Sequence, residues 1–405
     1  MTTRHRLTPG SDIKALLLAD PKHLRTEIID APPKAGPGAG PGDTAPSVER
    51  PTVLILGGNG FVGLHLLAEA ADDERIGRVV AIVRASGGLS ARDRLVDAAR
   101  RFGIALDLDR IEAVDGDINR PGFGLAESDH ARLADEIDIV VNAAGSTSHA
   151  RSYRHYRDTA IATYLRLLDF CALGRPKSFH TLGSLGGEVY KGLADFYRIG
   201  FYHCGYSRMK WVVKHMTRSF AAQGADVHVV MAPYVLGSRR TAYRDPALRY
   251  SFWQMVLFCA RMGRVWDDEN ILFPIISGET LARTVLDNAL SDAPKTEMYP
   301  ALDVDGAAFA EAFGLERVPW PDFRRALFRR HRLTRRSIDP RRPVASLRGA
   351  ARQVAYTRGL FPSDLPRLMR SVTTAAEPDR LAVSHPDLSA ELLVKCARAN
   401  RILRR

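Results

Sequence analysis

Tyr206 and Lys210 have the residue types and the spacing of an acid–base couple. Being four positions apart, their side chains lie on one face of any helix that contains them. A free tyrosine has a pKa near 10, and a cation one helical turn away favours its phenolate, which suits the phenol to proton transfer near neutral pH. Ser184, which ends an apolar segment 22 residues before Tyr206, is predicted to hydrogen-bond the same substrate carbonyl oxygen. Tyr-x-x-x-Lys alone is a common chance pattern, so its meaning depends on its surroundings.

Three glycines at intervals of three, Gly57, Gly60 and Gly63, follow an apolar segment at 52–56. Glycine lets the backbone turn tightly and approach a pyrophosphate, and a helix that begins there offers N–H groups and the positive end of its dipole. The spacing differs from the G-x-G-x-x-G of many dehydrogenases. Its position after the first strand of a β-α-β unit nevertheless predicts a dinucleotide site.

Residues at the ends of the following strands indicate which dinucleotide binds. Arg84 follows the second predicted strand, about twenty residues after the last glycine, where a basic side chain suits the 2′-phosphate of NADP. Arg94, at the start of the next helix, is expected to bind the same phosphate. Asp117 is placed to accept a hydrogen bond from the adenine amino group. The segment Asn142-Ala143-Ala144-Gly145 ends a strand with the small residues that close approach of a cofactor requires.

Alternating strands and helices must position these side chains. Strands are expected at 52–56, 78–83, 110–114 and 137–142, and helices at 61–71, 91–102 and 128–135. Further helices and strands are expected to continue through 227–234. Repeated β-α units predict an α/β Rossmann fold, a doubly wound parallel sheet with right-handed crossovers.

Three regions are expected along the chain. Residues 1–50 form an extension with a short helix and a Pro/Gly linker, because the composition of 31–46 cannot sustain helix or strand. Residues 51–237 form the NADP-binding Rossmann domain, to which later segments return. Residues 238–405 form a smaller, mostly helical substrate- or carrier-binding region with a basic tail.

The composition indicates a globular protein, because 45% of residues are hydrophobic and 26% are charged. No apolar segment approaches the roughly 18 residues of a membrane helix, and the first residues lack the apolar core of a signal peptide. The four cysteines do not have the paired spacing of a zinc site. We therefore expect a cytoplasmic protein with no disulfide and no metal.

The net charge of +12 is concentrated near the C-terminus, where residues 321–405 hold 20 Lys and Arg against seven Asp and Glu. A localised basic surface suits nucleic acid, anionic lipid or an acidic protein, and charge alone does not choose among them. The tail lacks the spacing of a helix-turn-helix or a zinc finger. We expect neither nucleic acid nor a membrane as partner.

Several motifs share the pattern of one superfamily: GGNGFVG (57–63), VRA (83–85), GDINRPGFGL (116–125), NAAG (142–145), KSFHTLGS (177–184) and GYSRMKWV (205–212). Over about residues 50–290 the chain resembles the extended short-chain dehydrogenases/reductases. More specifically, it is similar to the thioester reductases that end polyketide and nonribosomal peptide assembly lines. Carboxylic acid reductase and fatty acyl-CoA reductase domains are close relatives of that group.

This resemblance implies Ser184, Tyr206 and Lys210 as the catalytic set, with NADPH as hydride donor and no metal. Ser184 and Tyr206 would donate hydrogen bonds to the developing alkoxide, and Lys210 would orient the nicotinamide ribose. The implied cofactor-binding residues are Gly57, Gly60, Phe61, Val62, Gly63, Arg84, Arg94, Asp117, Ile118, Asn142, Ala143, Ala144, Lys210 and Pro233.

The resemblance also implies the substrate, an acyl, polyketide or peptidyl thioester on the phosphopantetheine arm of an acyl or peptidyl carrier protein, or acyl-CoA. The product would be an aldehyde, or an alcohol after a second reduction. Because no adenylation or carrier domain is recognisable, the enzyme is expected to stand alone and act in trans. The basic tail is expected to attract an acidic carrier protein.

Three positions depart from the family pattern. Thr159 stands where many members have Asn, which puts a proton relay through that side chain in doubt. Ala232-Pro233-Tyr234 replaces the usual Arg-Pro-Gly, so contacts with the substrate should differ there. Gly183-Ser184 stands where relatives often have Ser-Thr, so Thr181 stays an alternative to Ser184.

Two other functions stay open. An extended reductase of a free carbonyl, an alcohol or a nucleotide-linked substrate would have the same motifs. A non-catalytic NADP-sensing regulator commonly lacks the Tyr/Lys pair.

Overall fold

The computed structural model describes residues 49–148, 151–187, 205–222, 224–237, 256, 259–260, 262–267, 272–300, 302–319, 321–323, 325–326 and 390–399. The helix and linker expected before residue 50, much of the region expected to be mostly helical after residue 237 and nearly all of the basic tail lie outside these residues.

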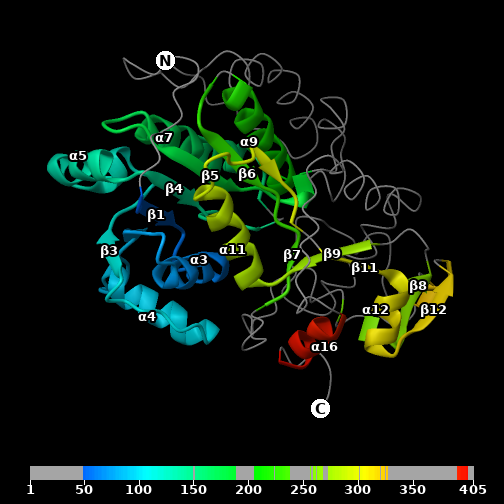
Figure 1. The fold of residues 1–405 in the computed structure, drawn as a ribbon. Helices are drawn as coiled ribbons and strands as arrows, with labels where there is room; N and C mark the ends of the chain where they lie inside the picture. The colour runs from blue at the N-terminus through cyan, green and yellow to red at the C-terminus, as the bar shows by residue number, and fades with distance from the viewer. Residues whose placement is uncertain are drawn as a thin grey trace.

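Seven parallel strands form the central sheet, in the order β10-β6-β5-β4-β1-β2-β3 (Figure 1). They are β1 (Thr52–Leu56), β2 (Arg78–Val83), β3 (Ile111–Asp115), β4 (Ile139–Asn142), β5 (Ser178–Leu182), β6 (Val227–Val230) and β10 (Glu297–Met298). The strand order reverses between β1 and β4, and doubly wound sheets bind ligands at the carboxyl ends of strands at such a point. The predicted Rossmann fold is confirmed.

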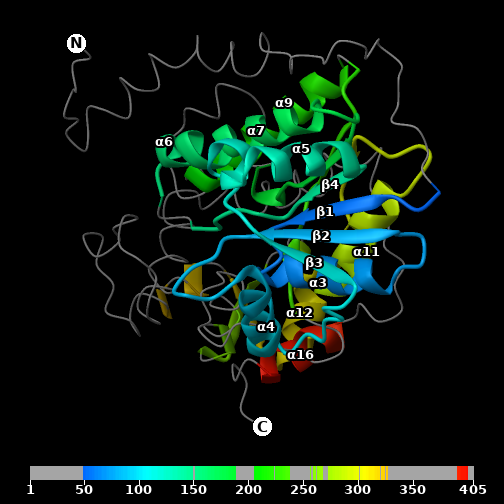
Figure 2. The same ribbon diagram turned by 90° about the vertical axis from the view of Figure 1, so that its left-hand side faces the viewer.

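Helices cover both faces of this sheet (Figures 1 and 2). One face carries α3 (Phe61–Asp72), α4 (Ala91–Phe102) and α11 (Gly278–Ala289), and the other carries α5 (Glu127–Glu136), α7 (Ala162–Cys171) and α9 (Gly205–Ala222). Alternate residues of a strand point to opposite faces. Val53 therefore joins the core of the first face and Leu54 that of the second, which explains why β1 is apolar throughout.

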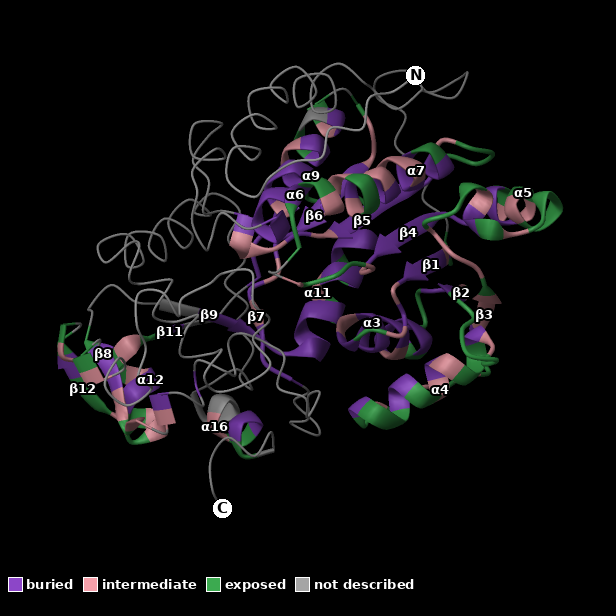
Figure 3. Ribbon diagram, turned by 180° about the vertical axis from the view of Figure 1, so that it is seen from behind, coloured by how far each residue is buried: buried purple, intermediate pink, exposed green. Residues whose placement is uncertain are grey.

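The helix α9 is buried over most of its length, whereas α4 and α5 expose one side (Figure 3). Two of its charged side chains share one carboxylate: Lys214, 5% exposed, lies 3.1 Å from an oxygen of Glu297, which also contacts Arg218. Because Glu297 belongs to β10, the edge strand of the sheet fixes the position of α9.

The last part of the alternating pattern, expected through 227–234, contains β6, which ends at Val230. Tyr234 begins β7 (Tyr234–Val235), which belongs to a second sheet. Pro233 has no N–H with which to continue a strand ladder. The chain therefore leaves the central sheet after Met231, whose N–H donates to the carbonyl of Met298 at 2.8 Å.

Later segments return to the sheet: α11 packs against α3, and β10 pairs with β6. The other described elements of this region are β8 (Arg264–Asp267), β9 (Leu272–Ile276), β11 (Leu302–Asp305), α12 (Gly306–Phe313), β12 (Glu316–Pro319) and α16 (Ala390–Ala399). The strands form a sheet β11-β9-β7 and a pair β12-β8. The expectation of a mostly helical region does not capture these strands, which are short, and β9 contains Pro274, a residue that argues against a strand in sequence. The division at residue 237 stays a prediction.

Within the described residues, no helix combines the length and the apolar character needed to cross a bilayer.

Candidate active site

The turn between β1 and α3 requires glycine at two positions. Gly57 has a φ of +80°, and a Cβ there would lie 2.6 Å from the backbone nitrogen of Ala144. A Cβ on Gly63 would overlap the carbonyl oxygen of Gly57, which accepts the N–H of Gly60 at 2.9 Å. The turn therefore lies directly against the small residues after β4.

The start of α3 has no side-chain cap. Gly60, at the N-cap position, has no side chain to accept a hydrogen bond, and the first turn of the helix contains no acidic residue. N–H groups at the start of a helix attract anions when no side chain occupies them. This cradle, which spans Gly57 to Gly63, fits the pyrophosphate of a nicotinamide dinucleotide.

Arg84, Arg94 and Asp117 come together at the ends of β2 and β3. The guanidinium of Arg94, on α4, donates to the carbonyl of Arg84, so it reaches the backbone that follows β2. The Arg84 side chain is 64% exposed, and its Nη1 lies 3.8 Å from Oδ2 of Asp117. An exposed guanidinium beside the cofactor turn suits an anionic group such as a phosphate.

Asp117 is held as a carboxylate. Burial opposes its ionisation, but hydrogen bonds from Asn119 and the charges of Arg84 and Arg120 outweigh that effect and hold the pKa of Asp117 below its ordinary value. The neighbouring Ile118 is half-buried and packs against the core under α7. A carboxylate is an acceptor only, as binding of an amino group requires.

The end of β4 is fixed by Asn142. Its Oδ1 accepts the N–H of Ala144 at 3.1 Å, and its Nδ2 donates to Oγ1 of Thr181 on β5 at 3.4 Å. Thr181 is 4% exposed and lies inside the sheet. Its hydroxyl is thus engaged in strand packing, which favours Ser184 over Thr181 as the group that meets a substrate.

The start of α9 and the loop after β5 converge through two glycines. A Cβ on Gly205 would lie 2.5 Å from the N–H nitrogen of Tyr153, at the start of α6 (Tyr153–Tyr156). A Cβ on Gly187, in the short helix η4 (Leu185–Gly187), would lie 3.0 Å from the backbone nitrogen of Trp211. The loop that carries Ser184 therefore packs against the turn of α9 that carries Lys210.

Ser184, Tyr206 and Lys210 are brought together by this packing. The Cβ position of Gly186 lies 3.4 Å from Oγ of Ser184 and 3.9 Å from Cε1 of Tyr206, so both side chains flank one residue. The Nζ of Lys210 lies 5.9 Å from the centre of the Tyr206 ring and donates to the carbonyl of Leu182 at 2.6 Å. Burial lowers the pKa of Lys210 to about 8, so it is still mainly an ammonium at pH 7.

Tyr156 is a member of the site that the sequence does not reveal. Its ring packs edge-on to that of Tyr206, with centroids 6.2 Å apart. Its hydroxyl donates to the carbonyl of Ser148 at 2.7 Å, so it connects the segment after β4 to Tyr206. In the sequence it is one more aromatic residue on a helix, which gives no signal of this role.

Thr159 and the segment Ala232-Pro233-Tyr234, two positions that depart from the family pattern, have different surroundings. Thr159 is exposed in a π-helical turn, η3 (Arg157–Ile161), and its hydroxyl donates to the carbonyl of His155 in the same helix at 2.6 Å. Pro233 is buried, and the carbonyl of the preceding Ala232 accepts the N–H of Leu185 at 3.1 Å, so this segment borders the loop that carries Ser184.

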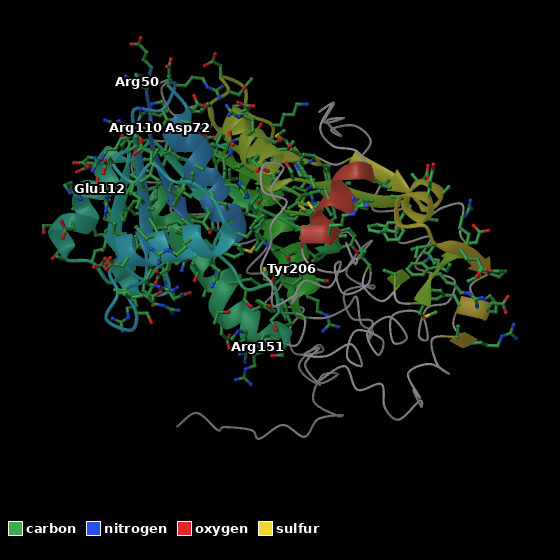
Figure 4. All side chains as sticks on the ribbon, turned by 90° about the horizontal axis from the view of Figure 1, so that it is seen from below. Arg50, Asp72, Arg110, Glu112, Arg151 and Tyr206 are labelled. Atoms are coloured by element: carbon green, nitrogen blue, oxygen red, sulfur yellow. The ribbon has the colours of Figure 1, made fainter. Side chains whose placement is uncertain are left out.

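Tyr206 lies away from the amino-terminal end of the sheet. In Figure 4, Arg50, Arg110 and Glu112, which precede or begin strands, lie at one end of the domain, and Tyr206 and Arg151 lie toward the other. The described residues contain no group of three or more His, Cys, Asp or Glu side chains arranged to hold a metal.

Comparison with known proteins relates the chain to biosynthetic reductases. Residues 55–285 match the family model described as male sterility protein. The nonribosomal peptide synthetase asaC of Aspergillus flavus is 28% identical over 200 residues, which cover 46% of this chain and 20% of that protein. L-2-aminoadipate reductase of Schizosaccharomyces pombe is 25% identical over 214 residues, 48% of this chain and 15% of that protein. The chain thus spans a fifth or less of these relatives.

Solved structures of reductase domains share the fold. The terminal R domain from the myxalamid PKS-NRPS pathway superimposes with a TM-score of 0.69 at 18% identity, covering 96% of this chain and 97% of that one. A thiolation-reductase di-domain from an archaeal non-ribosomal peptide synthetase gives a TM-score of 0.66 at 14% identity, covering 97% of this chain and 80% of that one. At these identities the likeness concerns the fold.

Proposed function

The chain belongs to the male sterility protein family, within the thioester reductases of the extended short-chain dehydrogenases/reductases, and we propose that it reduces an acyl thioester with NADPH. The observation that carries the proposal is the convergence of Ser184, Tyr206 and Lys210 at the carboxyl end of β5. That strand neighbours β4, whose last residues touch the glycine turn, so the catalytic groups lie two strands, about 10 Å, from the dinucleotide cradle.

NADPH supplies the hydride when it is bound. The hydroxyls of Ser184 and Tyr206 donate hydrogen bonds to the thioester carbonyl oxygen as that oxygen gains negative charge, an effect worth about 3 kcal/mol per donor. Tyr206 then gives its proton to this oxygen, which completes a hemithioacetal. The ammonium of Lys210 stabilises the phenolate that results, and one of its three N–H donors is held by Leu182.

Release of the product reverses the proton transfer. The phenolate of Tyr206 takes back the hydroxyl proton of the hemithioacetal as the C–S bond breaks. The thiolate leaves with the sulfur electron pair and is protonated by water, and an aldehyde remains. A second cycle on the aldehyde would give an alcohol.

The preference for NADPH is supported by Arg84 and Arg94. Arg84 follows β2, and the guanidinium of Arg94, on α4, reaches the carbonyl of Arg84. The 2′-phosphate of a bound dinucleotide lies at this end of the second strand in Rossmann domains. No acidic residue occupies the position after β2 that would bind ribose hydroxyls in an NAD site.

A carrier protein is the proposed partner. One of the solved neighbours joins a thiolation domain to its reductase, which supports a substrate bound as a phosphopantetheine thioester. We propose that this chain acts on its carrier in trans, attracted through the basic residues of 321–405. Turnover of a carrier-bound substrate should then fall as salt rises, while turnover of a small acyl-pantetheine thioester should not. A flat salt response with the carrier would remove the electrostatic attraction from the proposal.

The central test is removal of one hydroxyl. With an acyl-pantetheine thioester, Tyr206→Phe should lower NADPH consumption by about a hundredfold or more and leave NADPH affinity unchanged. Tyr164→Phe is the matched control, because the buried hydroxyl of Tyr164 bonds Thr217 and not the site. Unchanged turnover in Tyr206→Phe would refute the assignment. Reduction of free ketones or nucleotide-linked sugars, with thioesters inert, would favour another extended reductase.

A further inference from the structure

The carboxylate assigned to adenine is fixed by a side chain from a different element. Oδ1 of Asp117 accepts two hydrogen bonds from Asn119, from its backbone N–H at 3.0 Å and from Nδ2 at 2.9 Å. The amide oxygen of Asn119 in turn accepts the hydroxyl of Thr163 at 2.9 Å. Thr163 belongs to α7, lies 44 residues away in sequence and is 7% exposed. A buried hydroxyl thus orients the amide, and the amide orients the carboxylate.

The backbone after Asp117 is equally constrained. Gly122, Phe123 and Gly124 have consecutive φ values of +56°, +57° and +67°, a left-handed run that includes one residue with a side chain. Such a conformation costs a non-glycine residue about 1–2 kcal/mol, and it persists only where packing determines it. The Phe123 ring is 2% exposed and packs 4.9 Å from that of Phe170, and the Phe123 carbonyl accepts the N–H of Asp117 at 2.7 Å.

These contacts occupy one oxygen of the carboxylate. Both bonds from Asn119 go to Oδ1 of Asp117, whereas Oδ2 is the oxygen 3.8 Å from the exposed guanidinium of Arg84. The oxygen on the side of Arg84, Oδ2, is therefore the one that Asn119 does not engage. A group whose rotamer is already set loses less entropy on binding than one that must be ordered by the ligand.

We propose that Asn119, held by Thr163, is a positioning residue that presents Oδ2 of Asp117 to the adenine amino group. The inference rests on the proposed function, since it requires a dinucleotide with adenine at Asp117. It concerns affinity and not the chemical step, because Asn119 acts at the opposite end of the cofactor from Tyr206.

The test separates the two halves of the cofactor. Dissociation constants are measured by calorimetry for NADPH, for the adenosine bisphosphate that forms its adenine half, and for reduced nicotinamide mononucleotide. In Asn119→Ala we expect affinity for NADPH and for the adenine half to fall about fivefold, the scale of one ordinary hydrogen bond. Affinity for the mononucleotide and the turnover number at saturating NADPH should not change, which a general loss of structure would not produce.

Variants of Thr163 and Thr159 provide the matched comparison. Thr163→Val removes the hydroxyl and should weaken adenine binding in the same direction, whereas Thr163→Ser keeps the hydroxyl and should restore it. Thr159→Val removes a hydroxyl from the neighbouring exposed turn, where it bonds only the carbonyl of His155, and should leave adenine binding unchanged.

The outcomes distinguish this inference from the proposed function. If Asp117→Ala binds the adenine half as tightly as the parent chain does, the adenine role of Asp117 is overturned, and this inference is overturned with it. Weakened binding in Asp117→Ala together with parent-like binding in Asn119→Ala would overturn the inference alone. Neither result bears on thioester reduction, which the Tyr206→Phe comparison decides separately.

Discussion

Replacing Gly57 by alanine should separate the glycine turn from the end of β4. Two costs can be worked out from the structure. The φ of +80° costs an alanine about 1–2 kcal/mol. Its Cβ would also lie 2.6 Å and 2.7 Å from N and Cα of Ala144, and 2.8 Å from the carbonyl carbon of Ala143. These are backbone atoms that cannot rotate away, and overpacking of this kind costs about 1–3 kcal/mol more.

The total, about 2–5 kcal/mol, should appear partly as lost stability and partly as lost cofactor binding. Even 2 kcal/mol taken from binding is about a thirtyfold increase in the dissociation constant. We would measure NADPH affinity from quenching of protein fluorescence and the free energy of unfolding from urea titrations. Both quantities should fall in Gly57→Ala.

Two control variants separate the costs. Gly87→Ala has a φ of +64° with no atom within 4 Å of its Cβ, so it should show the conformational cost alone. Gly145→Ala, in the segment after β4, has neither a positive φ nor a nearby atom and should resemble the parent. If Gly57→Ala binds NADPH and unfolds as Gly145→Ala does, the close approach of turn and strand is not what shapes the cradle.

Three further predictions follow from the charged groups. Burial lowers the pKa of Lys210 to about 8, so its ammonium is present below that pH and lost as the pH rises through it. The rate of reduction should therefore fall on the alkaline side of about pH 8, and Lys210→Arg should move this limb to higher pH; a limb that stays in place belongs to another group. Arg84→Ala should weaken NADPH binding about tenfold and NADH binding little, whereas Arg92→Ala, which removes an exposed arginine paired with an aspartate, should change neither. Equal losses for the two cofactors would contradict the phosphate role. Lys177 donates to three backbone carbonyls, and Lys177→Met should lower the free energy of unfolding by about 2–5 kcal/mol, with exposed Lys295→Met as control in the same urea titrations. Burial lowers the pKa of Lys177 from 10.5 to about 8, so the unfolded chain binds more protons between these values and the parent should gain stability as pH rises across that window. Lys177→Met should lack this contribution.

Local patterns predicted much of the Rossmann domain. The helix α4 has the predicted bounds because Ser90 forms a capping box with Asp93 and Gly103 ends it in the left-handed conformation, signals that lie within a few residues of each other. The alternating pattern expected through 227–234 spans two sheets, because the chain joins a different sheet after Pro233. The pattern of apolar residues does not record which sheet a segment joins.

The sequence by itself determined the glycine turn, the placement of Tyr206 and Lys210 on one face of a helix, and the basic residues after β2. Each of these features depends on neighbours within one turn or one strand end. Only the tertiary structure decided that Thr181 is engaged by Asn142 while Ser184 and Tyr206 flank Gly186, that Tyr156 joins the site, and that Thr163 holds Asn119. These contacts join residues tens of positions apart. They form only when helices pack on a sheet in a particular register, and no local rule of spacing specifies that packing.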